Sequence, residues 1–103
     1  MQVVENLTEL TGRILDRQRH PSLDGFDVVA MRVEQARPIP GYADLLSARV
    51  PGDLDVVVRG ELLGDAGAGA VLRCRAAFTS RGEVMAEPYP AAGDFELLAP
   101  PDA

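Results

Sequence analysis

The stretch that decides the fold is residues 54–79, which read LDVVVRGELLGDAGAGAVLRCRAAFT. In residues 54–63 apolar side chains largely alternate with polar ones, and a similar alternation returns in residues 71–78. Successive side chains of a strand point to opposite faces, so a period of two indicates a strand. Each segment is therefore predicted to be a strand with one face towards a core and the other towards water.

A glycine- and alanine-rich segment, residues 64–70, joins the two predicted strands. It is longer than a two-residue turn, and its glycines tolerate positive φ angles. We therefore predict that the two strands pair directly as a loose antiparallel hairpin, around which the rest of the chain wraps. Gly60 interrupts the first strand and predicts a bulge or a sharp bend.

The composition indicates one small domain with an aliphatic core. The chain has 103 residues, 47% of them apolar, and it has no tryptophan. No apolar run approaches the about 20 residues needed to span a bilayer, and the N-terminus lacks a signal pattern. The single cysteine cannot form an internal disulfide, which suits a reducing compartment. We expect a cytoplasmic protein that is not associated with a membrane.

The formal net charge of −6 disfavours nucleic acid and anionic membranes as partners. All ten basic residues are arginine. The abundance of Ala, Gly, Pro and Asp favours a GC-rich coding bias as the reason, rather than selection for the geometry of the guanidinium group.

Further strands are expected at residues 11–17, 26–35, 83–87 and 94–98, with proline- or glycine-rich turns between most of the predicted elements. Residues 42–48 could form one or two helical turns, with Asp44 as a possible cap. Residues 99–103 are expected to be a loose C-terminal tail.

This pattern predicts a mainly β fold: one small antiparallel barrel or sandwich of five to six strands over residues 1–103, with at most one short helix near 42–48. The domain is similar in size to the five-stranded barrel of the oligonucleotide/oligosaccharide-binding (OB) type. In that type the helix lies between the third and fourth strands, whereas the helical candidate here precedes the third, so the strand order stays open.

Residues suited to catalysis or metal binding are sparse. The one histidine, His20, and the one cysteine, Cys74, are far apart in the sequence and do not suggest a metal site. Cys74 lies on the predicted core face, and His20 is expected to be a solvated loop residue. We predict no catalytic residue, no metal and no cofactor, and a non-enzymatic role is favoured over acid–base catalysis by His20.

Two sets of side chains on the predicted outer faces are candidate sites. Arginine forks bind carboxylates and phosphates and anchor interfaces, although arginines interleaved with acids also form an ordinary solvated surface. Exposed apolar side chains on outer faces favour association. The candidate ligand-binding residues are Arg32, Arg59, Arg73 and Arg75, and the candidate interface residues are Val57, Leu63 and Val71.

The function favoured by these features is a non-catalytic interaction or accessory module that docks on a protein partner or forms a homo-oligomer. The alternative is a binder of an anionic small molecule or of nucleic acid through the arginine-bearing sheet face. Few aromatic side chains are placed to stack bases, which weakens the nucleic-acid version.

Overall fold

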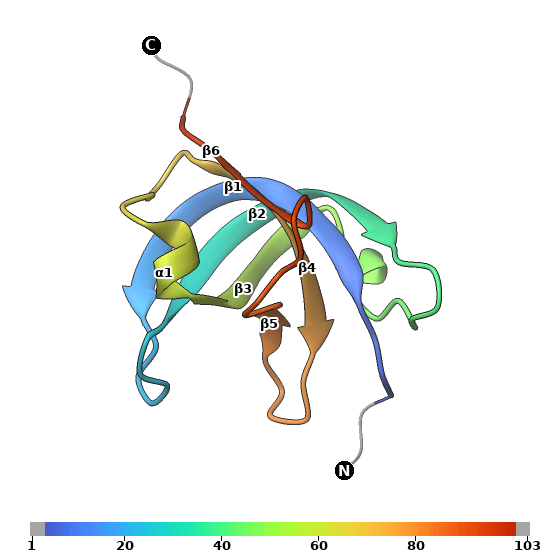
Figure 1. Cartoon of the computed structure of the whole chain (residues 1–103). Helices are drawn as coiled ribbons and strands as arrows, with labels where there is room; N and C mark the ends of the chain where they lie inside the picture. Colours follow the sequence, from blue (N-terminus) through green and yellow to red (C-terminus); the bar gives the residue numbers. More distant parts are fainter. Residues whose placement is uncertain (1–3, 101–103) are drawn as a thin grey trace.

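Six strands form a single sheet in the computed structural model, which describes residues 4–100 (Figure 1). β1 pairs with β2, β2 with β3, β3 with β5, β5 with β4, and β4 with β1, which closes a barrel of five strands. β6 adds to β4 as an extra strand. The elements are β1 (Thr8–Arg19), β2 (Phe26–Pro38), the 3-10 turn η1 (Ser47–Arg49), β3 (Gly52–Arg59), α1 (Gly60–Leu63), β4 (Val71–Phe78), β5 (Val84–Ala86) and β6 (Phe95–Leu98). The predicted mainly β fold, a small barrel or sandwich of five to six strands, is confirmed in its barrel form, although the β3–β5 pairing is parallel and not antiparallel as expected.

The predicted direct hairpin between β3 and β4 is wrong, because β5 lies between them. Val84 of β5 is in register with Val56 of β3 on one side and with Phe78 of β4 on the other. The β3–β5 pairing is parallel and the β4–β5 pairing antiparallel. Alternation in the sequence identifies the strands and their faces, but it carries no information about which strand lies beside which.

The helical segments also differ from the prediction. The strand expected to run to residue 63 ends at Arg59, and Gly60 begins the short helix α1, so the predicted bend at Gly60 is real. Near residues 42–48 there is only the three-residue turn η1. The carboxylate of Asp44 accepts hydrogen bonds from the backbone N–H of Leu46 (3.2 Å) and of Ser47 (3.0 Å) just before this turn.

β1 and β2 curve strongly around the barrel (Figure 1). Their register shifts between Thr11 and Gly12 and again between Ile14 and Asp16. At Gly12 the two backbones approach so closely that a Cβ atom would lie 2.1 Å from the carbonyl oxygen of Arg32. Only glycine fits there, and the close contact allows β1 to bend and pair with β4 as well as with β2.

The barrel interior is filled by aliphatic side chains, as the composition predicts. Cys74 is part of this core, and its burial raises the pKa of the thiol to about 12. β6 packs Phe95 and Leu97 against the same core. The largest interior side chains are Leu10, Ile14, Val29, Met31, Val33, Leu46, Val56, Val58, Leu63 and Leu72.

The expected C-terminal tail is described in part. Ala99 and Pro100 are exposed and belong to no strand or helix, and the other residues of the tail, 101–103, lie outside the described range. Within residues 4–100 there is no helix of the length and hydrophobicity that crossing a bilayer requires.

Candidate functional site

Two of the predicted ligand-binding arginines lie together on the outer face of β4. Arg73 donates a hydrogen bond to Glu9 (3.2 Å), and Arg75 is 3.3 Å from the carboxylate of Asp94. Glu9 is almost fully buried and also accepts a hydrogen bond from Arg37 (2.8 Å). The two guanidinium groups compensate the charge of this buried carboxylate, so loss of either arginine would leave it less well paired.

Arg32 and Arg59 do not join that cluster. Arg32 lies on β2, which β1 separates from β4, and it is 3.0 Å from the carboxylate of Asp53. The hydrogen bond and the negative charge of Asp53 raise the pKa of Arg32. Arg59 lies at the end of β3 and forms an ion pair with Glu61. The four arginines therefore do not form one continuous face.

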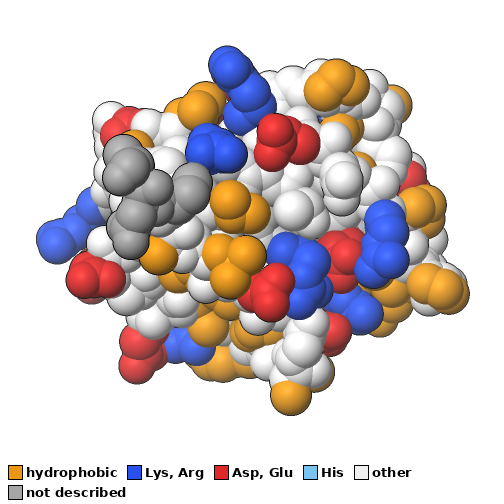
Figure 2. Space-filling view, turned by 90° about the horizontal axis from the view of Figure 1, so that it is seen from above, with side chains coloured by type: hydrophobic (Ala, Val, Ile, Leu, Met, Phe, Trp, Pro, Cys, Tyr) orange, Lys and Arg blue, Asp and Glu red, His pale blue; other side chains and the backbone are white. Residues whose placement is uncertain are grey.

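Each of these arginines has an acidic partner within the chain. Arginine and acidic side chains are also interspersed on the face seen in Figure 2, and no broad area of that face carries one sign of charge. An incoming anion would have to compete with the carboxylates already in place. This arrangement is typical of a solvated, internally neutralised surface.

The expectation that Val57 and Leu63 are exposed is wrong. Val57 is 2% exposed and Leu63 is 1% exposed. Leu63 belongs to the barrel core because α1, and not a strand, carries it over the end of the barrel. Val71 is half-buried on β4, in register with Leu98 of β6.

Val57 nevertheless lies on the outside of the barrel, where it forms part of an apolar row. In the strand register Val28 is opposite Val57, Val57 is opposite Met85, and Met85 is opposite Ala77. The side chains next to them in the sequence belong to the interior core: Val29, Val56, Val58, Val84 and Ala76. Because successive side chains of a strand point to opposite faces, these four point outward. The row thus crosses β2, β3, β5 and β4 on the outer surface, and the three side chains other than Val57 are half-buried.

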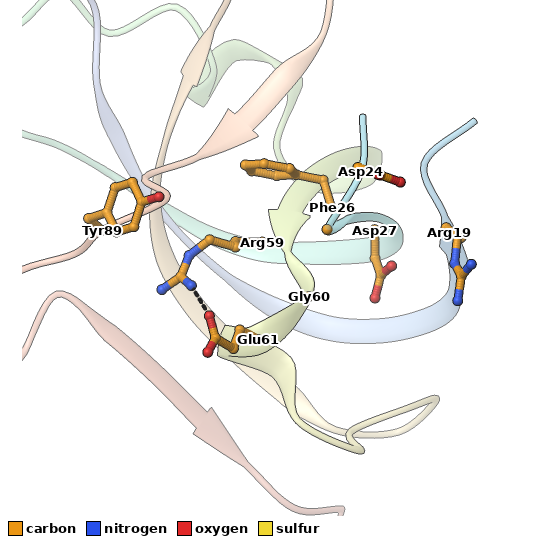
Figure 3. A pocket seen from close by; sticks show the side chains of 9 residues that line it. Arg19, Asp24, Phe26, Asp27, Arg59, Gly60, Glu61 and Tyr89 are labelled. Carbon is orange, nitrogen blue, oxygen red and sulfur yellow. Dashed lines mark hydrogen bonds and ion pairs between the residues drawn. The ribbon is translucent and has the colours of Figure 1, made fainter. Parts of the chain in front are cut away.

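Beside this row is a hollow of about 660 Å³ at the end of β3 (Figure 3). The start of β2, the β3–α1 junction and the segment after β5 supply its walls. Two aromatic rings line it, those of Phe26 and Tyr89, and Figure 3 shows Arg59 and Glu61 near Tyr89 and the aspartates near Arg19. The lining residues are Arg19, Asp24, Gly25, Phe26, Asp27, Arg59, Gly60, Glu61 and Tyr89.

The Arg59 side chain of this hollow is held in place by several contacts. Its Nε donates a hydrogen bond to the carbonyl of Pro88 (2.7 Å), and its guanidinium lies over the Tyr89 ring, 4.7 Å from the centroid. Phe26 is directly opposite Arg59 in the β2–β3 register. Tyr89 itself is 80% exposed. The hollow therefore presents a preformed stack of a guanidinium and an aromatic ring next to an apolar strip.

His20 is buried, contrary to the expectation of a solvated loop residue. Its Nδ1 accepts hydrogen bonds from the backbone N–H of Ser22 (3.1 Å) and of Leu23 (3.0 Å). Its Nε2 lies 2.8 Å from Oε2 of Glu83. Because both ring nitrogens are engaged inside the fold, His20 has a structural role.

The part of the chain that the structure describes contains no group of three or more His, Cys, Asp or Glu side chains that could hold a metal ion. Comparison with family models, with curated proteins and with solved structures found no match for this chain. The class of protein is therefore defined by the fold: a small, closed, five-stranded β-barrel with one added strand.

Of the residues in the hollow, the sequence identified Arg59 but neither Phe26 nor Tyr89. In the sequence Phe26 is only the first residue of a predicted strand and Tyr89 lies between two prolines, so neither stands out as a contact residue. A signal did exist for Tyr89: Pro88 and Pro90 restrict the backbone on both sides of it, and such proline segments favour exposed turns over strand interiors.

Proposed function

We propose that this chain is a non-catalytic interaction module that docks on a protein partner through the hollow at Phe26, Arg59 and Tyr89 and the adjoining apolar row. The observation that carries the proposal is the exposed Tyr89 ring stacked on a fixed arginine beside the half-buried side chains of Phe26 and Val28. Tyrosine and arginine are enriched among the residues that dominate binding energy at protein interfaces. A fixed arginine also loses little conformational entropy when a partner binds.

The proposal includes an OB-type barrel. The strand order β1-β2-β3-β5-β4-β1 and the position of α1 between β3 and β4 support it, since the OB helix lies between the third and fourth strands. In such barrels the face of strands two and three binds ligands. Phe26, Val28 and Val57 are on that face here. The reduced, buried state of Cys74 is compatible with the proposed cytoplasmic location.

The alternative, an anion binder that uses the arginine face, has less support. Arg32, Arg73 and Arg75 are already paired with carboxylates, and they lie on two separate parts of the barrel. A ligand phosphate would have to displace Asp53, Glu9 or Asp94 from its partner.

The test compares two exposed tyrosines that both lie in proline-containing segments. Tyr89→Ala removes the exposed ring of the hollow. Tyr42→Ala is the matched control, because Tyr42 is 42% exposed in the loop after β2 and lies outside the hollow. Proteins captured by the unaltered chain from extracts of the source organism are identified, purified and titrated against all three forms. We expect Tyr89→Ala to weaken binding at least about tenfold and Tyr42→Ala to leave it unchanged.

The same variants test self-association. Sedimentation velocity of the purified chain would identify a second copy as the partner if a dimer formed and Tyr89→Ala dissociated it. A strictly monomeric chain whose purified binding partners are equally insensitive to Tyr89→Ala and Arg59→Ala would overturn the proposal.

A further inference from the structure

We infer that the hollow beside Tyr89 accepts a basic side chain, arginine or lysine, from a segment of the partner protein. This inference rests on the proposed docking function and specifies the chemistry of the partner. It follows from the charges and the open acceptor atoms of the residues that line the hollow.

Three carboxylates and two guanidinium groups line the hollow, and Arg17 neutralises one of the carboxylates, so the preference for a cation rests on the free acceptor atoms and not on an excess of acidic groups. Asp24, Asp27 and Glu61 face the hollow together with Arg19 and Arg59. Asp27 is already bound by Arg17 at 2.7 Å. The other two carboxylates have unused capacity as hydrogen-bond acceptors.

Glu61 uses one oxygen for Arg59, and its Oε1 accepts no hydrogen bond from any residue between 4 and 100. The Glu61 side chain is 83% exposed. Asp24 is exposed and has neither a hydrogen bond nor an ion pair with any described residue. An ionised carboxylate can accept several hydrogen bonds through its two oxygens, so both groups can bind an incoming cation without releasing one already bound.

The Tyr89 ring provides an additional contact for a cation. Arg59 lies over the ring, but 80% of the residue is still exposed, so much of the ring can meet a second guanidinium or ammonium group. Such cation–π contacts are favourable at exposed sites and stronger once a partner has excluded water. Glu61 next to the ring would neutralise the added charge.

Arg19 does not reverse this preference. It lies opposite Asp27 in the β1–β2 register, and Figure 3 shows it at the side of the hollow away from Tyr89 and Glu61. At longer range the net charge of −6 attracts a basic partner and repels an acidic one. Base stacking on Phe26 and Tyr89 by a nucleic acid is the competing possibility, and the same net charge opposes its phosphates.

The experiment is a titration of the ¹⁵N-labelled full chain followed by NMR. The probes are a blocked hexapeptide of arginine, leucine and alanine with two arginines, two matched peptides with glutamine or glutamate in place of both arginines, and a short oligothymidine. We expect the arginine peptide to shift the amide signals of Phe26, Gly60, Glu61 and Tyr89. Its affinity should exceed that of the glutamine peptide about tenfold, as for two partly exposed ion pairs, and should fall as salt rises.

A pair of double variants separates local recognition from general attraction. Asp24→Asn with Glu61→Gln should reduce the affinity for the arginine peptide to that of the glutamine peptide. Glu34→Gln with Asp65→Asn, which removes the same charge from exposed positions outside the hollow, should leave most of the affinity intact.

Four results would overturn the inference: equal binding of the glutamine peptide, tighter binding of the glutamate peptide, shifts at these amides caused by oligothymidine alone, or no shifts with any probe. The docking function would survive the first two of these results if binding of a captured protein still depended on Tyr89. Failure of the inference is thus distinguishable from failure of the proposed function.

Discussion

Nε2 of His20 lies 2.8 Å from Oε2 of Glu83, which joins the β1–β2 connection to the turn between β4 and β5. Because Nδ1 accepts two backbone hydrogen bonds, the ring hydrogen of the neutral form must be on Nε2 and is donated to the carboxylate. The β1–β2 connection, which also forms one wall of the hollow, is thereby fixed to a distant part of the chain.

We predict that Glu83→Ala lowers the free energy of unfolding by about 1–3 kcal/mol, because it leaves a buried imidazole donor without an acceptor. Urea denaturation followed by circular dichroism measures the change. Glu34→Ala is the matched control, since Glu34 is exposed and accepts no hydrogen bond within the described range. Equal stability of the two variants would contradict the structural role of His20.

A second prediction concerns Arg17, which holds α1 against the barrel. Its guanidinium donates hydrogen bonds to the carbonyls of Gly64 and Ala66 (both 2.8 Å) and to the carboxylate of Asp27 (2.7 Å). The single ammonium of lysine cannot reproduce this fork. We expect Arg17→Lys to cost about 1–3 kcal/mol in urea denaturation.

The control for this substitution is Arg13→Lys. Arg13 is exposed on the same strand and makes no ion pair or side-chain hydrogen bond to any residue in the range 4–100. Its replacement should change the free energy of unfolding by less than about 0.5 kcal/mol. If both lysine variants behaved alike, the carbonyl contacts of Arg17 would be energetically unimportant.

A third prediction concerns the contact at Gly12. The methyl group of Gly12→Ala would have to displace the backbone of Arg32, so β1 and β2 must separate at the bend. We expect a loss of more than about 2 kcal/mol, as for other strained or overpacked core positions. Gly67→Ala is the control, because no atom lies within 4 Å of the added carbon there. A thermal melt of Gly12→Ala that coincided with that of Gly67→Ala would refute the prediction.

A fourth prediction follows from Asp44. Hydrogen bonds from the backbone N–H of Ser47, from the Thr8 hydroxyl and from the backbone N–H of Leu46 lower the pKa of Asp44 to about 2. Because the folded pKa lies below the ordinary value of 3.8, ionised Asp44 stabilises the fold above about pH 4, and this contribution disappears as the pH falls towards 2.

Asp44→Asn should therefore reduce the free energy of unfolding at pH 7 by about 0.5–1 kcal/mol, a small value because the group is exposed to solvent. The difference from the unaltered chain should shrink as the pH is lowered from 5 to 2 in urea titrations. A difference independent of pH would contradict the role of the charge. Asp65→Asn, at an exposed site whose carboxylate has no hydrogen bond in residues 4–100, serves as the control.

The fold class was accessible from the sequence because burial in this barrel follows a period of two. Leu72, Cys74 and Ala76 are buried and Arg73 and Arg75 face outward, as the alternation in β4 predicts. Gly60 likewise marked the true end of β3. These features depend on local physical chemistry, which a sequence displays directly.

Strand partners and the hollow could not be predicted in the same way. The position of Val84 between Val56 and Phe78 depends on contacts distant in sequence, and no local pattern specifies it. The stack of Arg59 on Tyr89 exists because the chain after β5 passes the end of β3. The burial of His20 depends on Glu83, which is just as distant in sequence.

The insertion of β5 between β3 and β4 has a consequence for synthesis on the ribosome. β3 and β4 are joined only through β5, so they cannot be connected in the sheet until residues 84–86 have been synthesised. The barrel therefore cannot close while the chain has been made only as far as β4. The meander of β1, β2 and β3 is available first, and the barrel closes only after β5 has been added.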